Sequence, residues 1–292
     1  MRFDHTGLAH LFGVIGPDEY HEPVDDNAFT NVLARWNLRA AADRCDSAGD
    51  QAVSIEERSR WRSVADALVD GLDPATGVYE QFAGFNKLEP LRIADVAPQR
   101  PITADLLLGR DRVRGAQVVK QADVLMLHHL LPEEVASASL GPNLDFYEPR
   151  TAHGSSLSPG VHASLFARAG RLDRALELLR MAAAVDVDDL TRTAAGGVHI
   201  ATMGSVWQAL AFGFVGLRPL GGSLSVDPRL PESWRALEIG LRFRGASIRV
   251  RVEPEIVSLV SDAPVTVAIG GRQVACDPGR TEIPYEAAGG SS

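Results

Sequence analysis

Apolar residues recur with a helical period from the N-terminus to about Leu217. In the clearest stretch, apolar side chains fall on one face of a helix: Met203, Val206, Trp207, Leu210, Ala211 and Phe214. A helix with one continuous apolar face packs that face against the interior of a protein. We therefore expect this helix to be deeply buried.

Five further segments have the same period and predict core helices. They cover about residues 29–40, 54–68, 118–132, 161–170 and 175–183. Ser54 and Glu57 form a capping box at the start of the second segment, and Gly170 closes the fourth. The loops between neighbouring helices are short, which favours antiparallel pairs.

Beyond Pro219 the period changes to two, which is typical of strands with one buried face. Alternating apolar positions predict strands at about 237–243, 248–252, 257–259 and 265–269. The sequence LRPLGGS separates the two patterns, because proline and glycine do not continue a helix. We predict three regions: a helical domain over 1–217, a small antiparallel β domain over 218–286 and a flexible tail over 287–292.

Composition and charge exclude several classes of protein. The chain has 292 residues, of which 45% are hydrophobic and 23% charged, as is ordinary for a folded globular protein. A net charge of -9 without a basic stripe argues against nucleic-acid binding. Cys45 and Cys276 lie far apart and are expected to be free thiols in a reducing compartment. The sequence has neither a secretory signal nor a membrane-spanning apolar stretch, so we expect a cytoplasmic protein.

Five acidic residues and a histidine occupy the segment GPDEYHEPVDDNAFTN, residues 16–31, which leads into a predicted helix. A carboxylic acid that protonates a glycosidic oxygen needs a raised pKa, which burial or neighbouring carboxylates such as Asp18 and Glu22 can provide. Glu19 is the natural candidate for such an acid.

Two alternatives account for the same acidic residues. Together with Asn27, they could simply cap the helix and interact with its macrodipole. A metal could instead bind Asp18, His21, Glu22 and Asp25, but these mixed ligands match no closed zinc or calcium spacing. We therefore predict no metal site.

The motif GPDEYHE, followed by DNAFTN, is similar to the segment around the general acid of glycoside hydrolase family 65 phosphorylases. The resemblance implies that Glu19 is the general acid. A second segment, KQAD, is similar to a family segment that lines the substrate pocket, and it implies this role for Lys120 and Gln121. Without the family, Lys120 and Asp123 are simply an i, i+3 pair on a helix surface.

A third segment, YEPRTAHGSSLS at residues 147–158, is similar to the family loop that binds inorganic phosphate. Ser155 and Ser156 can donate hydroxyl groups, Gly154 lets the backbone approach an anion, and His153 adds a further donor. Taken alone, the segment is an ordinary serine-rich loop that caps a helix. Many relatives carry an acidic residue at the position of Gly154, which leaves the acceptor sugar open.

The segment GGVHIATMG, residues 196–204, resembles the family's GIHIASMGG run, and the resemblance implies that His199 contacts the same phosphate. By itself, a single histidine beside an apolar helix is more often a core residue. His128 and His129 cannot share one face of a helix, because neighbours diverge by about 100°. This pair is therefore left out of the site.

The resemblance implies inverting phosphorolysis, in which Glu19 protonates the glycosidic oxygen while bound phosphate attacks the anomeric carbon from the opposite face. The products are β-glucose 1-phosphate and a free acceptor, and no metal or organic cofactor is required. Maltose, trehalose, kojibiose, nigerose and glucosylated polyols all fit as substrates. The first rival is an inverting α-glucoside hydrolase with Glu148 or Asp145 as its base.

For the fold, the resemblance implies the later half of an (α/α)6 barrel followed by a small C-terminal antiparallel β-sandwich. Family members are much longer, so we hypothesise that the chain is truncated. The second rival function is therefore a non-catalytic carbohydrate-binding fragment. Family members commonly dimerise, and exposed helix faces favour association, so a homodimer is expected. Neither a nucleic acid nor a membrane is an expected partner.

Overall fold

The computed structural model describes residues 1–49, 52–220 and 223–285. The chain divides into two compact units, Met1–Ser158 and Pro159–Ser292. No helix in the described part of the chain is both long and apolar enough to cross a bilayer. The predicted tail over 287–292 lies outside the described residues.

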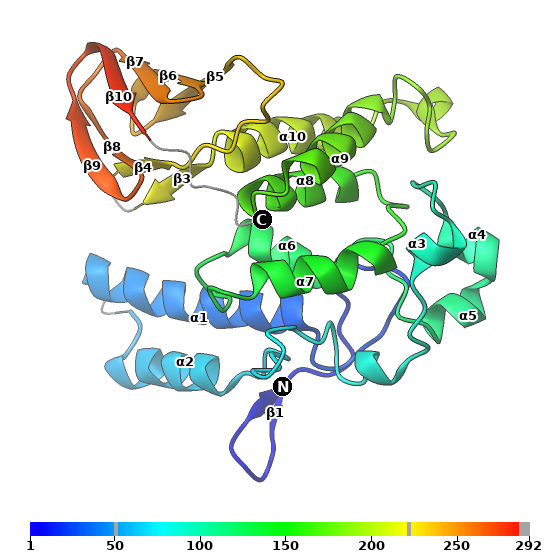
Figure 1. The fold of residues 1–292 in the computed structure, drawn as a ribbon. Helices are drawn as coiled ribbons and strands as arrows, with labels where there is room; N and C mark the ends of the chain where they lie inside the picture. The colour runs from blue at the N-terminus through cyan, green and yellow to red at the C-terminus, as the bar shows by residue number, and fades with distance from the viewer. Residues whose placement is uncertain (50–51, 221–222, 286–292) are drawn as a thin grey trace. The chain divides into compact units, whose positions relative to one another are not determined.

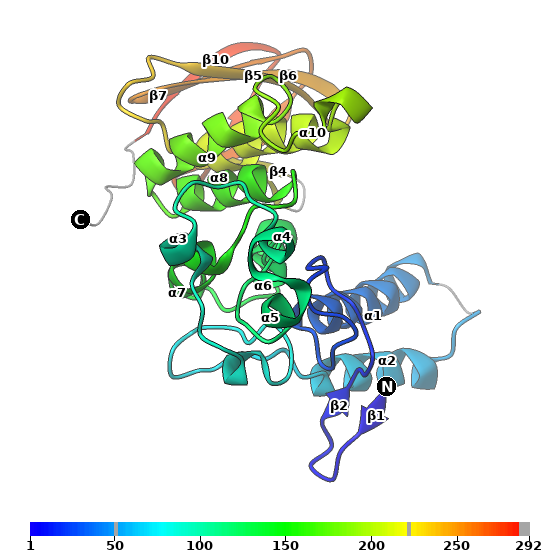
Figure 2. The same cartoon turned by 90° about the vertical axis from the view of Figure 1, so that its right-hand side faces the viewer.

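The first unit combines a short antiparallel strand pair, two long helices and a series of short helices (Figures 1 and 2). Its elements are β1 (Arg2–Phe3), β2 (Ala9–His10), α1 (Ala28–Ala48), α2 (Ile55–Ala67), η1 (Phe85–Lys87), α3 (Ile93–Val96), α4 (Ala104–Leu108), α5 (Arg110–Arg114), α6 (Asp123–Leu130), α7 (Leu140–Tyr147) and η2 (Glu148–Arg150). Helices α1 and α2 lie side by side, as do α4 and α5.

Side-chain caps fix the start of both long helices. The Asn27 side chain accepts a hydrogen bond from the Thr30 N–H (3.0 Å), and the Ser54 hydroxyl accepts one from the Glu57 N–H (3.1 Å). Both predicted helices and the predicted Ser54 cap are confirmed. Trp36, which was expected in the core, is exposed instead.

The helix expected to begin near Val118 begins only at Asp123, the first residue of α6. The residues before Asp123 are not helical, because the backbone of Val119 pairs with a distant segment. The Val119 N–H donates to the Arg150 carbonyl (3.0 Å), and the Ala152 N–H donates to the Val119 carbonyl (2.8 Å). The first two residues of the KQAD motif, Lys120 and Gln121, therefore lie in a bend before the helix, not on it.

The second unit contains helices followed by two sheets. Its helices are α8 (Ser158–Arg168), α9 (Leu172–Ala184), η3 (Ala194–Gly196), α10 (Ile200–Gln208) and the π-helix η4 (Ala209–Phe214). Its strands are β3 (Leu217–Leu220), β4 (Ser223–Val226), β5 (Leu237–Phe243), β6 (Ala246–Glu253), β7 (Ile256–Ser261), β8 (Val265–Ile269), β9 (Arg272–Cys276) and β10 (Gly279–Pro284).

Small residues let α8 approach α10 and η4 closely. A Cβ added to Gly160 would lie 2.2 Å from Ser205 Oγ, and one added to Gly213 would lie 2.8 Å from the Ser164 Cα. Neither glycine can therefore carry a side chain without moving the neighbouring helix. This contact depends on small residues, which a search for large apolar residues does not detect.

The buried face predicted for α10 is wrong for this reason. Met203 and Trp207 are 43% and 45% exposed, whereas Thr202 and Ser205 are buried. Further along, the wider turn of η4 changes the phase of the helix, and of the residues predicted to be buried there Ala211 and Phe214 are buried, whereas Leu210 is half-buried.

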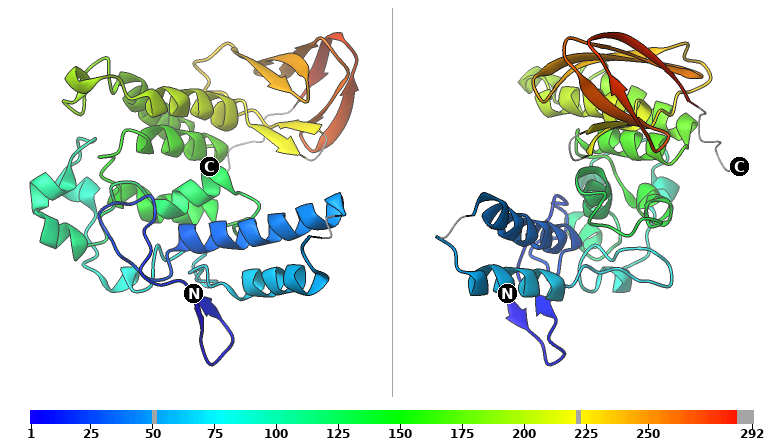
Figure 3. Two further views of the ribbon diagram at one scale, coloured as in Figure 1. Left: turned by 180° about the vertical axis from the view of Figure 1, so that it is seen from behind. Right: turned by 90° about the vertical axis from the view of Figure 1, so that its left-hand side faces the viewer.

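The strands form two sheets (Figure 3). Each has four strands, in the orders β10-β7-β6-β5 and β3-β4-β8-β9. Their alternate residues build one apolar core, which includes Val250, Leu259 and Val267. The four strands predicted from the period of two are confirmed. Every pairing between described strands is antiparallel except that of β4 with β8, which is parallel.

Candidate active site

The loop that carries Glu19 is held from inside by the carboxylate of Asp18, which is 1% exposed. Asp18 accepts hydrogen bonds from the Lys120 N–H (2.9 Å) and from Gln81 Nε2 (3.1 Å). The same carboxylate pairs with Nδ1 of His21 (2.8 Å). Asp18 therefore ties the Glu19 loop to two segments distant in sequence, those of Lys120 and Gln81, and to the nearby His21.

A second buried carboxyl, that of Asp123, completes this support. One of its oxygens accepts the Asp18 N–H (2.6 Å), and the other accepts Nδ2 of Asn27 (2.7 Å). A Cβ on Gly16 would lie only 1.9 Å from the second oxygen, so glycine is required there. Asp123 is thus an interior residue, and its interpretation as one of a pair of helix-surface charges is wrong.

Burial controls the ionisation of Asp123. Removal from water, together with the nearby Asp18 carboxylate, raises the pKa of Asp123, and the hydrogen bonds from Asn27 and from the Asp18 N–H oppose this shift. Desolvation is the largest of these effects.

Glu19 itself faces solvent, with a side chain that is 60% exposed. Its carboxylate lies 2.7 Å from Nζ of Lys120. Both residues line a pocket of about 640 Å³, which Gly154 also lines. The rest of the lining is rich in charge: Glu22, Asp105, Arg110 and Arg114. The pocket therefore suits a polar ligand with many hydroxyl groups.

Tyr20 supports the floor of this pocket. Its hydroxyl accepts the Ala104 N–H (2.9 Å), and burial raises the pKa of Tyr20 to about 12, so the phenol stays neutral. A Cβ on Gly154 would lie 3.4 Å from this hydroxyl and 2.8 Å from the Ile102 carbonyl oxygen. A side chain at this position therefore has no room in this arrangement.

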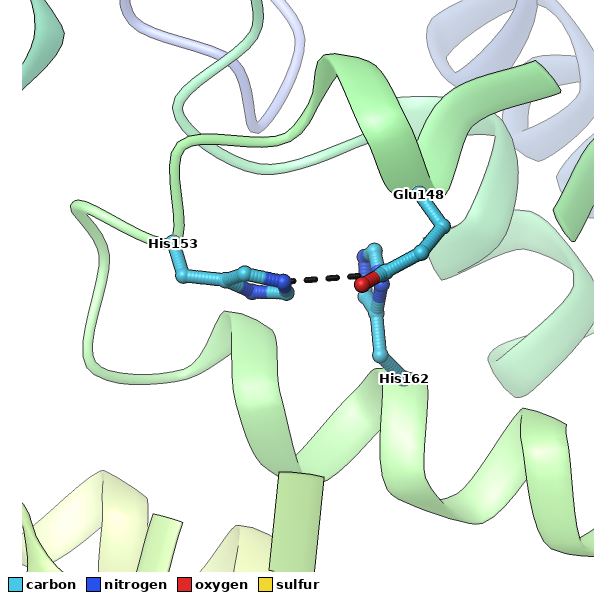
Figure 4. Close-up of side chains that lie close together, drawn as sticks. All are labelled: Glu148, His153 and His162. Carbon is cyan, nitrogen blue, oxygen red and sulfur yellow. Dashed lines mark ion pairs between the residues drawn. The ribbon is translucent and has the colours of Figure 1, made fainter. Parts of the chain in front are cut away.

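The predicted phosphate loop begins with a buried histidine. His153 has a left-handed backbone (φ 54°) and a fully buried side chain. Its Nδ1 lies 3.0 Å from the Ser158 hydroxyl, and its Nε2 lies 3.5 Å from a Glu148 oxygen (Figure 4). Ser155 and Ser156 follow Gly154 and are half-buried.

Glu148 is itself ion-paired. Arg100 lies 3.3 Å from the Glu148 carboxylate and also donates to the Glu148 and Thr151 carbonyls (2.8 and 2.9 Å). Arg100 thereby joins the segment before the phosphate loop to a distant stretch of chain. Asp145, the other candidate base, is exposed.

The remaining predicted site residues have other surroundings. The Gln121 side-chain amide donates to the Pro17 carbonyl, so it supports the Glu19 loop from the side. His199 belongs to the second unit, where its Nδ1 pairs with Asp186 (2.5 Å). The four candidate metal ligands do not share one centre: for example, Asp25 accepts the Gly13 N–H (2.9 Å).

The structure thus brings Glu19, Lys120 and Gly154 to one pocket, although they come from three separate motifs. Sequence reasoning missed the inward role of Asp123 and gave no role to Gln81. Both residues bind Asp18 from distant parts of the chain, so no local sequence signal could have found them.

Comparison with known proteins identifies both parts of the chain. Residues 1–208 match the glycosyl hydrolase family 65 central catalytic domain, and residues 217–276 match the C-terminal domain of the same family. An uncharacterized glycosyl hydrolase from Mycobacterium tuberculosis is 38% identical over 275 residues, which cover 90% of this chain and 34% of that protein. Kojibiose phosphorylase from Halothermothrix orenii is 33% identical over 260 residues, which cover 84% of this chain and 33% of the enzyme.

The chain thus spans about a third of the length of these relatives. A solved structure from the human microbiome, assigned as a kojibiose phosphorylase, superposes with a TM-score of 0.85 at 23% identity. The match covers 99% of this chain and 44% of that one, so the two share a fold.

Proposed function

This chain belongs to glycosyl hydrolase family 65, and on that premise we propose that it serves the inverting phosphorolysis of an α-glucoside disaccharide to β-glucose 1-phosphate. The observation that carries the proposal is the placement of Glu19 beside Lys120 in a polar pocket. The name of the Halothermothrix orenii relative supports the reaction class. The helical part then belongs to an (α/α)6 barrel.

Glu19 acts as the general acid and protonates the oxygen of the bond that breaks. A protonated carboxyl cannot keep an ion pair, so the 2.7 Å contact with Lys120 is exchanged when substrate binds. The released ammonium group then donates to a sugar hydroxyl, and Gln121 holds the Glu19 loop through Pro17. Substrate binding thereby prepares the acid for proton transfer.

Inorganic phosphate is the nucleophile and attacks the anomeric carbon from the face opposite Glu19. The hydroxyls of Ser155 and Ser156 donate to it, and His153 holds the loop from inside because its side chain is buried. His199 remains a predicted phosphate ligand. The reaction needs no metal or organic cofactor, since phosphate already carries the charge and the nucleophilic oxygen.

A hydrolase of the same family is less well supported. It needs a carboxylate that can take a proton from water, and Glu148 is already ion-paired with Arg100 (3.3 Å) and His153 (3.5 Å). Asp145 is exposed. The pairing of Glu148 therefore favours phosphate over activated water as the nucleophile.

The test is release of glucose 1-phosphate from kojibiose, trehalose, maltose, nigerose and a glucosylated polyol, with and without phosphate. It uses this chain and a version extended upstream with the matching region of a longer relative. We expect phosphate-dependent release from the extended version and its loss in Glu19→Gln. Free glucose formed without phosphate would support the hydrolase, and normal turnover by Glu19→Gln would exclude the proposed mechanism.

A further inference from the structure

Two buried carboxyl groups behind the pocket cross-link the Glu19 loop and the Lys120 segment in both directions. Asp123, three residues after Lys120, accepts the backbone N–H of Asp18 (2.6 Å). Asp18, directly before Glu19, accepts the backbone N–H of Lys120 (2.9 Å). Each segment thus supplies a backbone donor to the carboxyl group of the other.

A glutamine closes the arrangement into a ring. Gln81 donates through Nε2 to Asp18 (3.1 Å), and its Oε1 accepts the Asp123 N–H (3.3 Å). Asn27 donates through Nδ2 to the other oxygen of Asp123 (2.7 Å), and its side-chain oxygen at the same time caps α1. Gly16 has no side chain, which leaves room for the Asn27 amide and the Asp123 carboxyl group to meet beside it.

We propose that Asp18 and Asp123 are positioning residues that set the Glu19 carboxyl and the Lys120 ammonium side by side: Asp18 binds the Lys120 N–H, and Asp123 binds the N–H of Asp18, directly before Glu19. The assignment of a catalytic role to this site rests on the proposed function. Neither aspartate contacts substrate in this proposal. Asp18 acts through the backbone of Lys120, and Asp123 acts through the backbone of Asp18, which directly precedes Glu19.

Energetics support a positioning role over a purely stabilising one. Two carboxyl groups close together in the interior cost free energy, and apolar residues of similar volume are often as stable or more stable. Catalysis depends steeply on geometry, and a misplacement of about 1 Å can cost roughly 10²-fold in rate. A rigid polar cross-link between the segments of two pocket residues therefore lowers stability but fixes the positions on which the reaction rate depends.

The proposal can be tested by exchanging the carboxyl group of Asp123 with the neighbouring amide group of Asn27. In Asp123→Asn, the new amide must face a donor on one side, either the Asp18 N–H or the amide of Asn27. In Asn27→Asp, two carboxyl groups would lie at the present 2.7 Å contact. The double variant Asn27→Asp/Asp123→Asn restores one donor and one acceptor, and aspartate still caps α1.

The first measurement is hydrogen exchange of the Asp18 and Lys120 amides in this chain, at a pH above the raised pKa of Asp123. We expect both amides to exchange faster in Asp123→Asn and to regain protection in the double variant. Unchanged protection of both amides in Asp123→Asn would overturn the proposal. This measurement needs no activity, so it decides the proposal even if the proposed function fails.

The second measurement is steady-state kinetics on the form that releases glucose 1-phosphate. At the same pH, above the raised pKa of Asp123, we expect kcat to fall by about 10²-fold in Asp123→Asn, with little change in KM for phosphate, and to recover largely in the double variant. Failure of the proposed function has a different signature: Glu19→Gln would keep normal turnover while the exchange pattern still follows Asp123.

Asn143→Asp is the matched control, because Asn143 is a fully buried polar residue of the same unit that lies outside the ring. Its side chain accepts the Tyr79 N–H (3.0 Å) and donates to the carbonyls of Gly77 and Ser139 (2.8 and 2.7 Å). This variant should lose stability but keep the protection of the Asp18 and Lys120 amides. If both variants lose the same factor in kcat at the same loss of stability, the carboxyl pair is merely structural.

Discussion

Two interiors of this chain are built in opposite ways. In the second unit, alternate residues of two sheets form an apolar core that includes Val250, Leu259 and Val267. Behind the Glu19 pocket, the interior is made of carboxyl and amide groups, chiefly those of Asp18 and Asp123. The first kind of interior gains stability from burial, whereas the second must satisfy every donor and acceptor that it removes from water.

The difference between the apolar and the polar interior predicts where this chain tolerates substitutions. An apolar core accepts many residues of similar volume, because dispersion and burial have no strict direction. A polar interior fixes distances and angles, and one misplaced donor leaves a buried group unsatisfied. We therefore expect substitutions in the sheets to alter stability alone, and substitutions around Asp18 to alter stability and chemistry together.

The largest expected effect is on the pH dependence of stability. Because burial raises the pKa of Asp123 from 3.8 to about 8, the folded state holds this proton more tightly than the unfolded state does. The contribution of this bound proton to the free energy of unfolding is fully present below about pH 4 and is lost as the pH rises through about 8. Denaturant unfolding across this window should show a decline in the wild type that Asp123→Asn flattens. An equal decline in the stability of the wild type and of Asp123→Asn would show that Asp123 is not the group that titrates.

Leu259→Ala should be the most damaging single change in the apolar core. Leu259 is 1% exposed within β7, so truncation leaves a cavity, and we expect a loss of about 2–5 kcal/mol in unfolding free energy. The pH dependence and the kcat of the remaining folded protein should match the wild type. A change in kcat per folded molecule would show that the two interiors are not independent in function.

Gly16→Ala should affect both properties, with a smaller loss of stability. The added methyl group would overlap an Asp123 oxygen at 1.9 Å and the Asn27 amide at 2.7 Å, and overpacking of this kind costs roughly 1–3 kcal/mol. We also expect kcat to fall, because the shift moves the carboxyl group that holds the Asp18 backbone. Gly204→Ala is the control: no heavy atom lies within 4 Å of the new Cβ on α10, so stability should rise slightly.

Ser54→Ala should have the smallest effect. It removes the acceptor for the Glu57 N–H (3.1 Å) at the start of α2, which costs about 1 kcal/mol. Turnover should be unchanged, because the cap lies in neither interior. Thermal unfolding would measure the loss, and Ser59→Ala within the same helix, where no cap is removed, should not reproduce it.

Local sequence determined much of the fold. The helical period predicted α1, α2, α8 and α9, and the period of two predicted four strands of the sheets, because both signals depend on neighbours a few residues away. The Ser54 cap was likewise readable, since a cap and its target lie within one turn. Glycines predicted helix ends well for the same reason, as at Gly170, which has φ +74°.

Part of the candidate site was also predictable from its motifs. The residues around Glu19 and Lys120 identified both as pocket residues, and the pocket lining contains both. Their contact was not predictable, because it joins residues 101 positions apart. The role of His153 as a direct phosphate ligand stays a prediction, since only the fold revealed that its side chain is buried.

Only the tertiary structure decided which polar residues face inward. Asp123 follows the pocket residues in a segment that the sequence predicts as a helix surface. The backbone pairing of Val119 with Ala152 delays the start of the helix to Asp123, whose carboxyl group accepts the Asp18 N–H in the interior. The exposed face of α10 was likewise decided by the close approach of Gly160 to Ser205. Sequence periodicity records which side chains avoid water locally, whereas the burial of a carboxyl group depends on donors from distant segments that only the folded chain brings together.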